Sequence, residues 1–221
     1  MKSVIIVPSY NSNDSLDTLI QRIKDSYSID IVVIDDGSIP QYSSTQSSVT
    51  VIRNRVNRGK GYSLRKAFDF VFKNGYTHAI TLDADLQHSP DEIQKFLDVS
   101  PEYSLVLGMR KRDRSMPLHR RFSNLATSYI ISKIIKRDVF DSQCGFRRYK
   151  MSETAYSDCI EDGFQFESEI LINSISMDSQ ITHVDIQTIY DVGNKSYIRH
   201  VSDTLKFIRL VFKSFIQNRW S

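Results

Sequence analysis

Residues 77–93 read THAITLDADLQHSPDEI, and this stretch holds a complete passage from a strand to a helix. Its first residues are mostly apolar and fit a short buried strand. Ser89 is a typical N-cap for the helix that follows, and Glu92 stands three residues after it, as in a capping box. Asp83 and Asp85 occupy the joint, so two carboxylates are expected where the strand ends.

Strand and helix patterns alternate on both sides of this joint. Apolar runs predict further strands, within residues 4–7, 29–38, 50–54 and 103–110. Apolar residues at helical spacing predict helices, within residues 11–27, 59–76 and 89–97. The inward-facing residues expected on the first two are Leu16, Leu19, Ile20 and Ile23, and Leu64, Ala67, Phe68, Val71 and Phe72. The alternation predicts an α/β fold in which a mostly parallel central sheet is covered on both faces.

The pattern changes after residue 110. Two more helices are expected within residues 119–138 and 164–177. The first should have an apolar side made of Phe122, Leu125, Ala126, Tyr129, Ile130 and Ile134. An alternating segment, 181–192, predicts a strand near a sheet edge. Residues from about 203 to 219 place basic side chains between helically spaced apolar ones and predict a C-terminal amphipathic helix. That helix either packs on the domain or lies on an anionic lipid surface; its surplus of apolar residues and Trp220 favour the lipid surface.

The totals describe 221 residues with a net charge of +3, enough chain for one domain and too little charge to imply nucleic acid. Two cysteines, Cys144 and Cys159, are too few for a zinc site or a disulfide framework, which predicts free thiols. Only four consecutive apolar residues precede Pro8, and no run of about 18 apolar residues occurs. We therefore expect a cytosolic protein without a signal peptide or membrane span.

A basic segment, residues 110–121, carries more positive charge than the chain as a whole. Its six arginines and lysines minus its one aspartate give +5, against +3 for the chain. A solvated basic face is one explanation, and nucleic-acid binding lacks the surface aromatics of a known module. Binding of an anionic acceptor fits best, because arginine matches phosphate oxygens in a forked geometry. We rank Arg110, at a strand end, before Arg121.

Polar residues follow several expected strands, at the carboxyl edge where open α/β sheets bind ligands. No GxGxxG loop follows the first strand, so a dinucleotide-binding fold is not indicated. Asp83 and Asp85 stand at i and i+2 and point the same way from an extended segment. Their mutual repulsion favours a divalent cation between them, Mg²⁺ or Mn²⁺, with Gln87 or His88 as a neutral ligand. The alternative is an acidic turn that caps the next helix.

Six motifs occur in one order: VIIVPSYN, VVIDDGS, NRGKGYSLRKA, TLDADLQHSPDEI, GMR and DSQCGFRRY. Together they resemble the family 2 glycosyltransferases of GT-A fold, specifically the dolichyl-phosphate mannose/glucose synthase-like branch. The resemblance runs from about Val4 to about Leu210. It implies a Rossmann-like, three-layer α/β sandwich in one domain, residues 1–221. It also implies a metal-dependent inverting transfer of a sugar from a UDP- or GDP-sugar to a polyprenyl phosphate.

The resemblance further implies where the nucleotide-sugar donor binds. The donor-binding residues that it implies are Pro8, Tyr10, Asn11, Asp36, Gly59, Lys60, Asp83, Ala84 and Asp85. The ligands that it implies for Mg²⁺ or Mn²⁺ on the donor diphosphate are Asp83, Asp85 and Gln87. Ser12 stands where many members have Glu, so that contact to the ribose or base is not carried over.

For the acceptor, the resemblance implies residues of the basic segment, of the DSQCGFRRY motif and of a late loop. The catalytic residues that it implies are Asp141, Arg110 and Arg121. The acceptor-binding residues that it implies are Arg110, Arg121, Gln143, Arg147, Lys195 and Ser196. Asp141 would orient groups for a phosphate acceptor, which is already ionised, and would be the general base for a sugar hydroxyl. The alternative for Asp141 is a turn acid.

Some neighbouring residues are expected to be structural. Cys144 is expected to pack and not to act as a nucleophile, and Phe146 to lie in the core. Glu167 and Glu169 cannot both face inward on a helix without a partner. One of them is therefore expected to pair with an arginine of the basic segment.

The expected partners are a nucleotide-sugar donor, a lipid-phosphate acceptor and, through peripheral contact, the cytoplasmic face of a membrane. No nucleic acid is expected, and a homo-oligomer stays open. Two alternative functions stay open as well: a GT-A glycosyltransferase acting on a sugar hydroxyl in cell-surface glycan synthesis, and a non-catalytic nucleotide-sugar-binding protein. The pair of Asp83 and Asp85 argues against the second, because a binding protein has no need of adjacent acids that repel each other.

Overall fold

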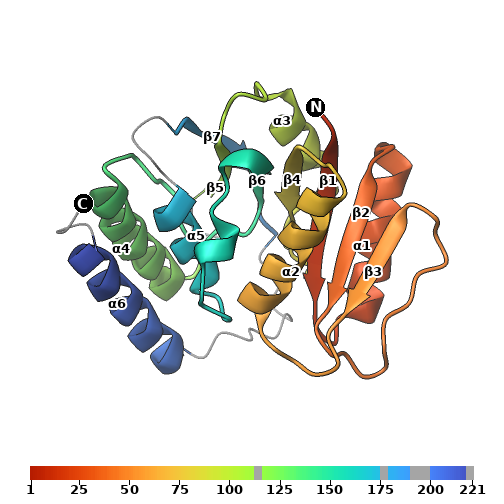
Figure 1. The fold of residues 1–221 in the computed structure, drawn as a ribbon, viewed down its shortest axis with the longest axis horizontal. Coiled ribbons are helices and arrows are strands. Elements are labelled where there is room, and N and C mark those ends of the chain that lie inside the picture. Colours follow the sequence, from red (N-terminus) through yellow and green to blue (C-terminus); the bar gives the residue numbers. More distant parts are fainter. Residues whose placement is uncertain (112–115, 175–178, 190–199, 218–221) are drawn as a thin grey trace.

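A seven-stranded sheet with helices on both faces makes up the fold (Figure 1). The structure, a computed structural model, describes residues 1–111, 116–174, 179–189 and 200–217. The acceptor candidates Lys195 and Ser196 lie outside the described residues, and so does Arg112 of the basic segment.

The elements alternate as the sequence predicts through the first half of the chain. The strands are β1 (Ser3–Ser9), β2 (Asp30–Asp35), β3 (Val49–Arg53), β4 (His78–Thr81), β5 (Leu105–Arg110), β6 (Arg147–Lys150) and β7 (Ile181–Ile186). The α-helices are α1 (Asn13–Ser26), α2 (Lys60–Lys73), α3 (Ile93–Asp98), α4 (Leu118–Ile135), α5 (Phe166–Ser174) and α6 (His200–Gln217). Short 3₁₀ turns lie at Pro90–Glu92, Met151–Glu153 and Tyr156–Asp158.

The strand order is β3-β2-β1-β4-β6-β5-β7, and β6 is antiparallel to both of its neighbours. The other pairings, β1 with β2 and β4, β2 with β3, and β5 with β7, are parallel. The predicted α/β fold with a mostly parallel sheet is thus confirmed, and β7 lies at an edge as expected.

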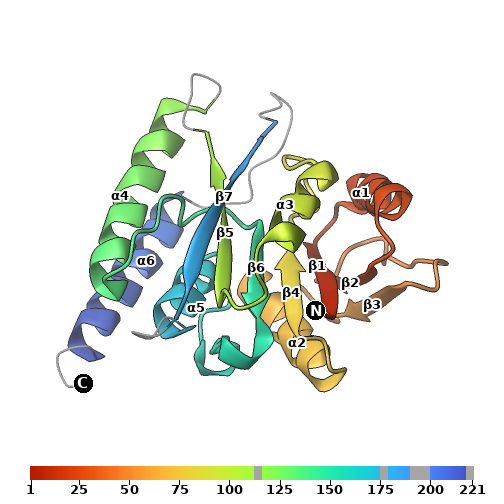
Figure 2. The same cartoon turned by 90° about the horizontal axis from the view of Figure 1, so that it is seen from above.

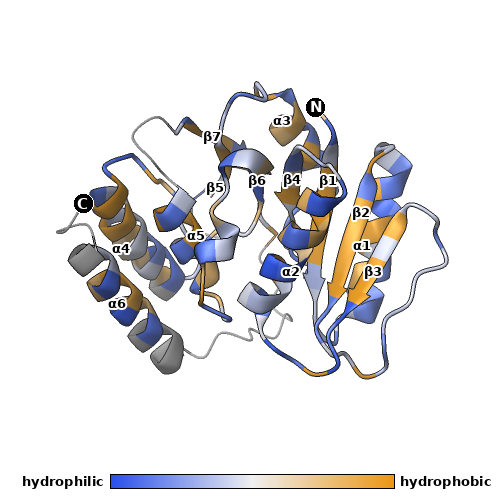
Figure 3. Ribbon diagram, in the orientation of Figure 1, coloured by the Kyte–Doolittle hydropathy of each residue, from blue (hydrophilic) through white to orange (hydrophobic). Residues whose placement is uncertain are grey.

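Two hydrophobic clusters sandwich the sheet and make three layers. Helices α1 and α3 pack on one face, while α2, α5 and part of α4 pack on the other (Figure 2). Burial alternates along β1, with Ile5 facing the first cluster and Val4 and Ile6 the second. Strands β1, β2 and β4, which are largely orange in Figure 3, therefore have both faces covered, as parallel sheets require.

Strand β6 was not predicted, because its sequence RRYK reads as charged surface. Both arginines are nevertheless fully buried. Arg148 donates to the carbonyl oxygens of Phe96 and Val99 at 2.7 and 2.6 Å, where helix α3 ends. Unpaired carbonyls at a helix C-terminus attract a cation, which makes this burial tolerable.

The antiparallel β6 brings two distant motifs together. Its register pairs Thr81 with Arg147, so the chain that follows β4 meets the chain that precedes β6. A Cβ atom built on Gly145 would stand 2.7 Å from Asp83 Oδ2, which confirms the contact. The DSQCGFRRY loop therefore lies against the aspartate pair, at the carboxyl edge of the parallel strands.

Helix α4 differs from the expectation for residues 119–138. The side expected to be apolar includes Phe122, Leu125 and Tyr129, and the structure leaves these three 75%, 53% and 62% exposed. Asn124 and Ser128 are buried instead, while Ile134 of the expected apolar side is buried as predicted. A similar but smaller difference occurs on α2, where Phe72, expected to face inward, is exposed.

Candidate active site

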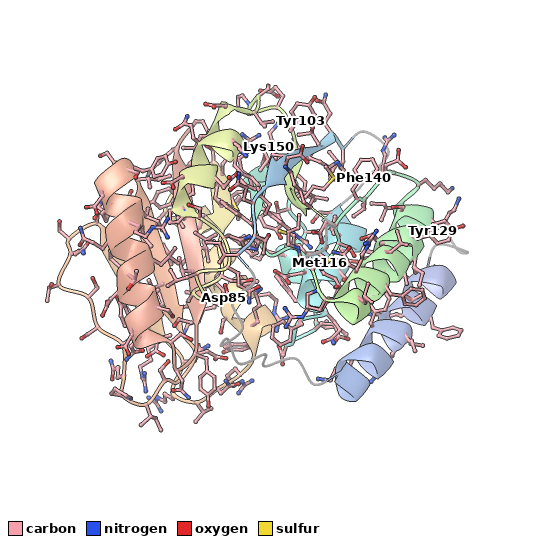
Figure 4. The ribbon with its side chains drawn as sticks, turned by 180° about the vertical axis from the view of Figure 1, so that it is seen from behind. Asp85, Tyr103, Met116, Tyr129, Phe140 and Lys150 are labelled. Atoms are coloured by element: carbon pink, nitrogen blue, oxygen red, sulfur yellow. The ribbon has the colours of Figure 1, made fainter. Side chains whose placement is uncertain are left out.

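Polar side chains gather at one edge of the sheet. They come from the ends of β1, β2, β4 and β5, from the loop before β6, and from the first residues of α2 and α5. Figure 4 shows Asp85 at this edge, while Tyr103 and Lys150 lie at the opposite one. This is the edge where open α/β sheets bind ligands, as predicted.

The two acids after β2 hold loops in place. Asp35 accepts hydrogen bonds from the backbone N–H groups of Ser38 and Tyr42 and pairs with Arg53. Asp36 accepts from the backbone N–H groups of Arg58 and Gly59 at 2.9 and 2.8 Å. Asp36 thus shapes the turn that leads into α2. Its direct contact with a nucleotide base stays a prediction.

The loop after β1 is fastened to the loop after β2. The Asn11 backbone N–H donates to Ser38 Oγ, and Asn11 Oδ1 accepts from the Ile39 backbone N–H, both at 2.9 Å. Pro8 and Tyr10 are half-buried beside this junction, and so remain partly open to solvent. The arrangement fixes the donor-binding candidates of the first two loops relative to each other.

A partly buried ion triad joins three elements of the site. Lys60 Nζ, at the start of α2, lies 2.6 Å from Asp83 Oδ1 and 3.0 Å from Glu167 Oε1. Gly145 lies against all three groups, and any Cβ there would come within 3.0 Å of Lys60 Nζ. Burial opposes the charge on Asp83, but Lys60 outweighs it and holds the pKa of Asp83 below its ordinary value.

Asp85 is the second member of the acidic pair. Burial and the neighbouring Asp83 raise the pKa of Asp85 above its ordinary value. Its Oδ1 accepts from the Gln87 backbone N–H at 3.0 Å, which closes the turn after the pair. Ala84, between the two acids, is buried.

The donor set of this turn fits a hard divalent cation, because carboxylate and amide oxygens are the ligands of Mg²⁺ and Mn²⁺. Within the described ranges, no three His, Cys, Asp or Glu side chains form a ready-made metal cluster. Asp83, Asp85 and Gln87 could supply part of a coordination shell and leave positions for phosphate oxygens. That partial shell is what a metal shared with a diphosphate requires.

Asp141 is held by a fork of donors and is only 1% exposed. Arg110 donates from Nε to Asp141 Oδ2 at 2.7 Å and from Nη2 to Oδ1 at 2.9 Å. Asn124 Nδ2, on α4, donates to the same Oδ1 at 2.7 Å. Burial would raise the pKa of Asp141, but these bonds to Arg110 and Asn124 outweigh it and lower the pKa.

The remaining acceptor candidates have different surroundings. Gln143 is exposed, with its backbone N–H 3.2 Å from Asp141 Oδ1 and its Nε2 3.1 Å from Ser123 Oγ. Arg121 is exposed on the first turns of α4. Both stay acceptor candidates, and the structure brings Gln143 into direct contact with Asp141.

Arg147, expected to bind the acceptor, is instead a structural residue. It is fully buried, and its guanidinium donates to the carbonyl oxygens of Cys144, Glu167 and Ser142 at 2.6 to 2.7 Å. A guanidinium committed to backbone carbonyls inside the protein cannot reach a ligand at the surface. Arg147 shapes the loop that carries Asp141.

An acid of α5 was expected to pair with an arginine of the basic segment, and this partner is wrong. Glu167 pairs with Lys60. Glu169 Oε2 accepts hydrogen bonds from the backbone N–H groups of Ile160 and Glu161, at N···O distances of 2.9 and 2.8 Å. Each buried acid therefore has its own local donors.

Three residues of the site were either missed in the sequence or considered there for another role. Asn124 was missed, although its spacing from Ser128 and Ser132 marks a polar stripe along α4. Gly145 was missed because only the β6 register shows what it faces. His88 was considered as a ligand; burial lowers its pKa to about 4, and its Nδ1 has no hydrogen-bond partner.

Two expectations for neighbouring residues are confirmed. Cys144 is buried, and burial raises the pKa of its thiol to about 12, so it packs as a neutral group. Phe146 is buried and stacks on Phe96, with ring centroids 4.2 Å apart. Neither residue offers a nucleophile to the site.

A family model described as "Glycosyl transferase family 2" matches residues 4–157. Two relatives are similar over most of their length. The UDP-N-acetylglucosamine–dolichyl-phosphate N-acetylglucosaminyltransferase of Methanococcus voltae is 25% identical, with 84% of this chain and 85% of that protein covered. The undecaprenyl-phosphate mannosyltransferase of Micrococcus luteus is also 25% identical, with 84% and 83% covered.

A solved structure shares the fold. The glucosyl-3-phosphoglycerate synthase of Mycobacterium tuberculosis, in complex with Mn²⁺, UDP and glucosyl-3-phosphoglycerate, superposes with a TM-score of 0.69. The alignment covers 96% of this chain and 79% of that one, at 15% identity. At this identity the likeness concerns the fold alone, and it confirms the expected GT-A fold.

Proposed function

The chain belongs to glycosyl transferase family 2, and from this premise we propose that it moves a sugar from a UDP- or GDP-sugar to a polyprenyl phosphate. The relatives from Methanococcus voltae and Micrococcus luteus, named for transfer to dolichyl and undecaprenyl phosphate, support this acceptor class. The chain is thus a glycosyltransferase, and the donor nucleotide, the metal and the inverting course belong to the proposal.

The proposed reaction is one in-line displacement. An oxygen of the acceptor phosphate forms a bond to the anomeric carbon while the bond from that carbon to the donor β-phosphate oxygen breaks. The nucleoside diphosphate leaves with the electron pair, and the configuration at the anomeric carbon inverts. No proton has to move, because the acceptor phosphate is already ionised at neutral pH.

The choice of a phosphate acceptor rests on one observation, the set of hydrogen bonds that Asp141 accepts from Arg110 and Asn124. A general base for a sugar hydroxyl needs a free lone pair directed at the acceptor. Both carboxylate oxygens of Asp141 accept from Arg110, and Asn124 adds a third donor, inside the protein. Asp141 is therefore suited to hold Arg110 beside an anionic acceptor and unsuited to take a proton.

The donor side supplies charge where the leaving group departs. A bound Mg²⁺ or Mn²⁺ would supply a Lewis acid that neutralises the departing diphosphate, with Asp83, Asp85 and Gln87 as its protein ligands. Lys60 places an ammonium group next to Asp83 at the same edge. Preorganised positive charge of this kind lowers the barrier because it needs no rearrangement as the reaction proceeds.

A lipid acceptor requires contact with a membrane, and we propose that α4 makes it together with α6. Leu118 and Phe122 on α4 are 80% and 75% exposed, and Phe212 on α6 is 65% exposed. The two helices are in contact. None of the helices that the structure describes is long and apolar enough to cross a membrane. The proposed contact is peripheral, at the cytoplasmic face.

The proposal is tested by nucleoside diphosphate release from a panel of UDP- and GDP-sugars with Mn²⁺, with and without a short polyprenyl phosphate. We expect release that requires one donor and the lipid phosphate and stops with a chelator. Release that is indifferent to the lipid, and that rises with a sugar alcohol acceptor, would favour the hydroxyl alternative. Donor binding without release under any acceptor would favour the binding protein.

Asp141→Asn separates the two acceptor classes in the same assay. Loss of a general base typically lowers kcat by about 10²- to 10⁴-fold. Loss of a group that positions Arg110 is expected to raise the KM for the lipid phosphate more than it lowers kcat. A variant with unchanged KM and almost no kcat would contradict the phosphate acceptor.

A further inference from the structure

The position of Lys60 is not explained by the helix that carries it. Lys60 is the first residue of α2, whose first turn holds no acid. A cation at a helix N-terminus is unfavourable, because the N–H groups there already form the positive end of the helix dipole. Its side chain is only 14% exposed, so it also loses most of its hydration. Something outside α2 must stabilise the ammonium group.

Two carboxylates do so, and together they exceed its charge. Lys60 Nζ lies 2.6 Å from Asp83 Oδ1 and 3.0 Å from Glu167 Oε1, so the triad carries a net charge of −1. A simple buried ion pair would be neutral. One negative charge thus remains in the triad, next to Asp85 in the same turn.

Asp83 has two competing uses in this arrangement. It is one of the proposed metal ligands, and its Oδ1 already accepts a hydrogen bond from Lys60. An ammonium group and a divalent cation are drawn to the same carboxylate oxygens. A metal bound at Asp83 Oδ1 would take the position of Lys60, and Glu167 Oε1 already lies within hydrogen-bond reach of the ammonium group.

We propose that Lys60 is a resident cation that neutralises Asp83 until the divalent metal binds, and that Glu167 is the positioning residue that retains Lys60 once it is displaced. The inference rests on the proposed metal site at Asp83 and Asp85. Lys60 stays in the site as a second positive group for the leaving diphosphate. Gly145 makes the exchange feasible, because a larger residue would fill the space between the three groups.

Hydrogen bonds in the surroundings hold Glu167 in a fixed position. The backbone carbonyl of Glu167 accepts from buried Arg147 at 2.6 Å. The turn before α5 is bound to the start of α2, where the Gly61 backbone N–H donates to Asp162 O at 2.8 Å. The two helix ends are therefore held together while the ammonium group changes partner.

The test measures Mn²⁺ binding alone, by the electron paramagnetic resonance signal of free Mn²⁺, with no nucleotide or acceptor. Four proteins are compared: wild type, K60Q, E167Q and the double variant K60Q/E167Q. Wild type and the double variant have the same net charge at the triad, −1. They differ in whether a competing ammonium group is present, so a pure charge effect cancels between them.

We expect the double variant to bind Mn²⁺ roughly tenfold tighter than wild type, because the competitor for Asp83 is gone. E167Q alone should bind Mn²⁺ several-fold more weakly, because Lys60 has lost the Glu167 carboxylate as an alternative partner and competes more strongly for Asp83. In the K60Q background, the same change should have a clearly smaller effect, because only the charge of Glu167 is then lost and not its hold on Lys60. The matched control is K73Q, on the exposed end of the same helix, which should bind like wild type.

Three outcomes would overturn the inference. Equal affinity of wild type and the double variant would mean that net charge alone sets Mn²⁺ binding. An equal loss from E167Q with and without Lys60 would mean that Glu167 acts on the metal directly. Absence of Mn²⁺ binding in all four proteins would overturn the proposed metal site itself, and with it the metal dependence of the proposed function. Circular dichroism of each variant verifies the fold.

Discussion

Helices α2 and α4 contribute to the same hydrophobic cluster, but α4 also turns polar side chains inward along its middle. Helix α2 buries Leu64 and Phe68, as an amphipathic helix on a sheet is expected to do. Helix α4 buries Asn124 and Ser128 along its middle and leaves Phe122 75% exposed. The difference shows that amphipathic spacing reveals the two faces of a helix, while the environment decides which face turns inward.

The environment that turns α4 is the buried carboxylate of Asp141. Its partner Asn124 comes from the polar stripe of α4, and Ser128 Oγ accepts from the Ser142 backbone N–H at 2.9 Å. Buried charge needs donors more than the core needs another apolar face. Phe122, Leu125 and Tyr129 of α4 are consequently left at the surface, where the proposed membrane contact would cover them.

The largest expected effect comes from two matched phenylalanine truncations. Phe68→Ala on α2 should lower the free energy of unfolding by about 3–5 kcal/mol, because it opens a cavity in the core. Phe122→Ala on α4 should change it by less than about 0.5 kcal/mol. Urea denaturation of both variants measures the contrast. Similar losses for the two would mean that α4 packs its apolar face in solution.

The next effect breaks the buried ion pair that organises α4. Asp141→Asn leaves Arg110 without its carboxylate and should lower the free energy of unfolding by about 3 kcal/mol. The control is Asp69→Asn, which breaks the exposed pair with Lys73 and should cost less than about 1 kcal/mol. Equal effects of the two substitutions would refute the claim that the buried pair of Asp141 and Arg110 stabilises the fold more than an exposed pair does.

A smaller effect is expected from the polar stripe itself. Asn124→Ala removes one donor to Asp141 while the Arg110 fork remains, so a loss of about 1.5–3 kcal/mol is expected. Leu125→Ala, on the exposed side of the same helix, is the matched control and should be nearly silent in urea denaturation. If Leu125→Ala proved the more damaging, the burial assigned to the two faces of α4 would be reversed.

The acid dependence of stability gives a finer test of the same pair. The pKa of Asp141 is lowered in the folded protein, because its bonds to Arg110 and Asn124 outweigh its burial. Its contribution is therefore fully present above the unfolded pKa, about 4, and is lost as the pH falls below it. The stability difference between wild type and Asp141→Asn should be constant from about pH 5 to 7 and should shrink towards about pH 2. A difference that grew on acidification would have the wrong sign.

Sedimentation with lipid vesicles measures directly whether the exposed face of α4 binds a membrane. Phe122→Ser with Phe212→Ser should weaken sedimentation with anionic lipid vesicles several-fold and leave unfolding nearly unchanged. Charge reversal at Lys73, far along α2, is the control that keeps apolar exposure constant. Undiminished sedimentation of the double variant would remove α4 and α6 from the proposed membrane contact.

The same contrast separates what the sequence could predict from what it could not. The parallel strands, their helices and the polar strand ends follow local rules, so the buried residues Leu16, Leu19, Ile20 and Ile23 of α1 were all foreseen. The aspartates at the end of β4 were foreseen for the same reason. Local patterns are sufficient where each element buries its own apolar face.

The rest depends on contacts between residues distant in the chain. Arg147 and Arg148 form a buried strand only because carbonyls of other segments accept from them. The pairing of Lys60 with Glu167 joins residues more than a hundred positions apart. Neither spacing nor composition encodes such partners, which is why Arg147 was placed at the acceptor and one of Glu167 and Glu169 beside an arginine.

The central claim, sugar transfer to a polyprenyl phosphate, is tested most directly by the mass of the lipid after incubation with Mn²⁺ and the preferred nucleotide-sugar. We predict a lipid phosphate heavier by one glycosyl residue, formed by wild type and by Lys73→Gln but not by Asp83→Asn. Nucleoside diphosphate release with a lipid of unchanged mass would contradict the account, because the sugar would then have gone to water or to a hydroxyl acceptor.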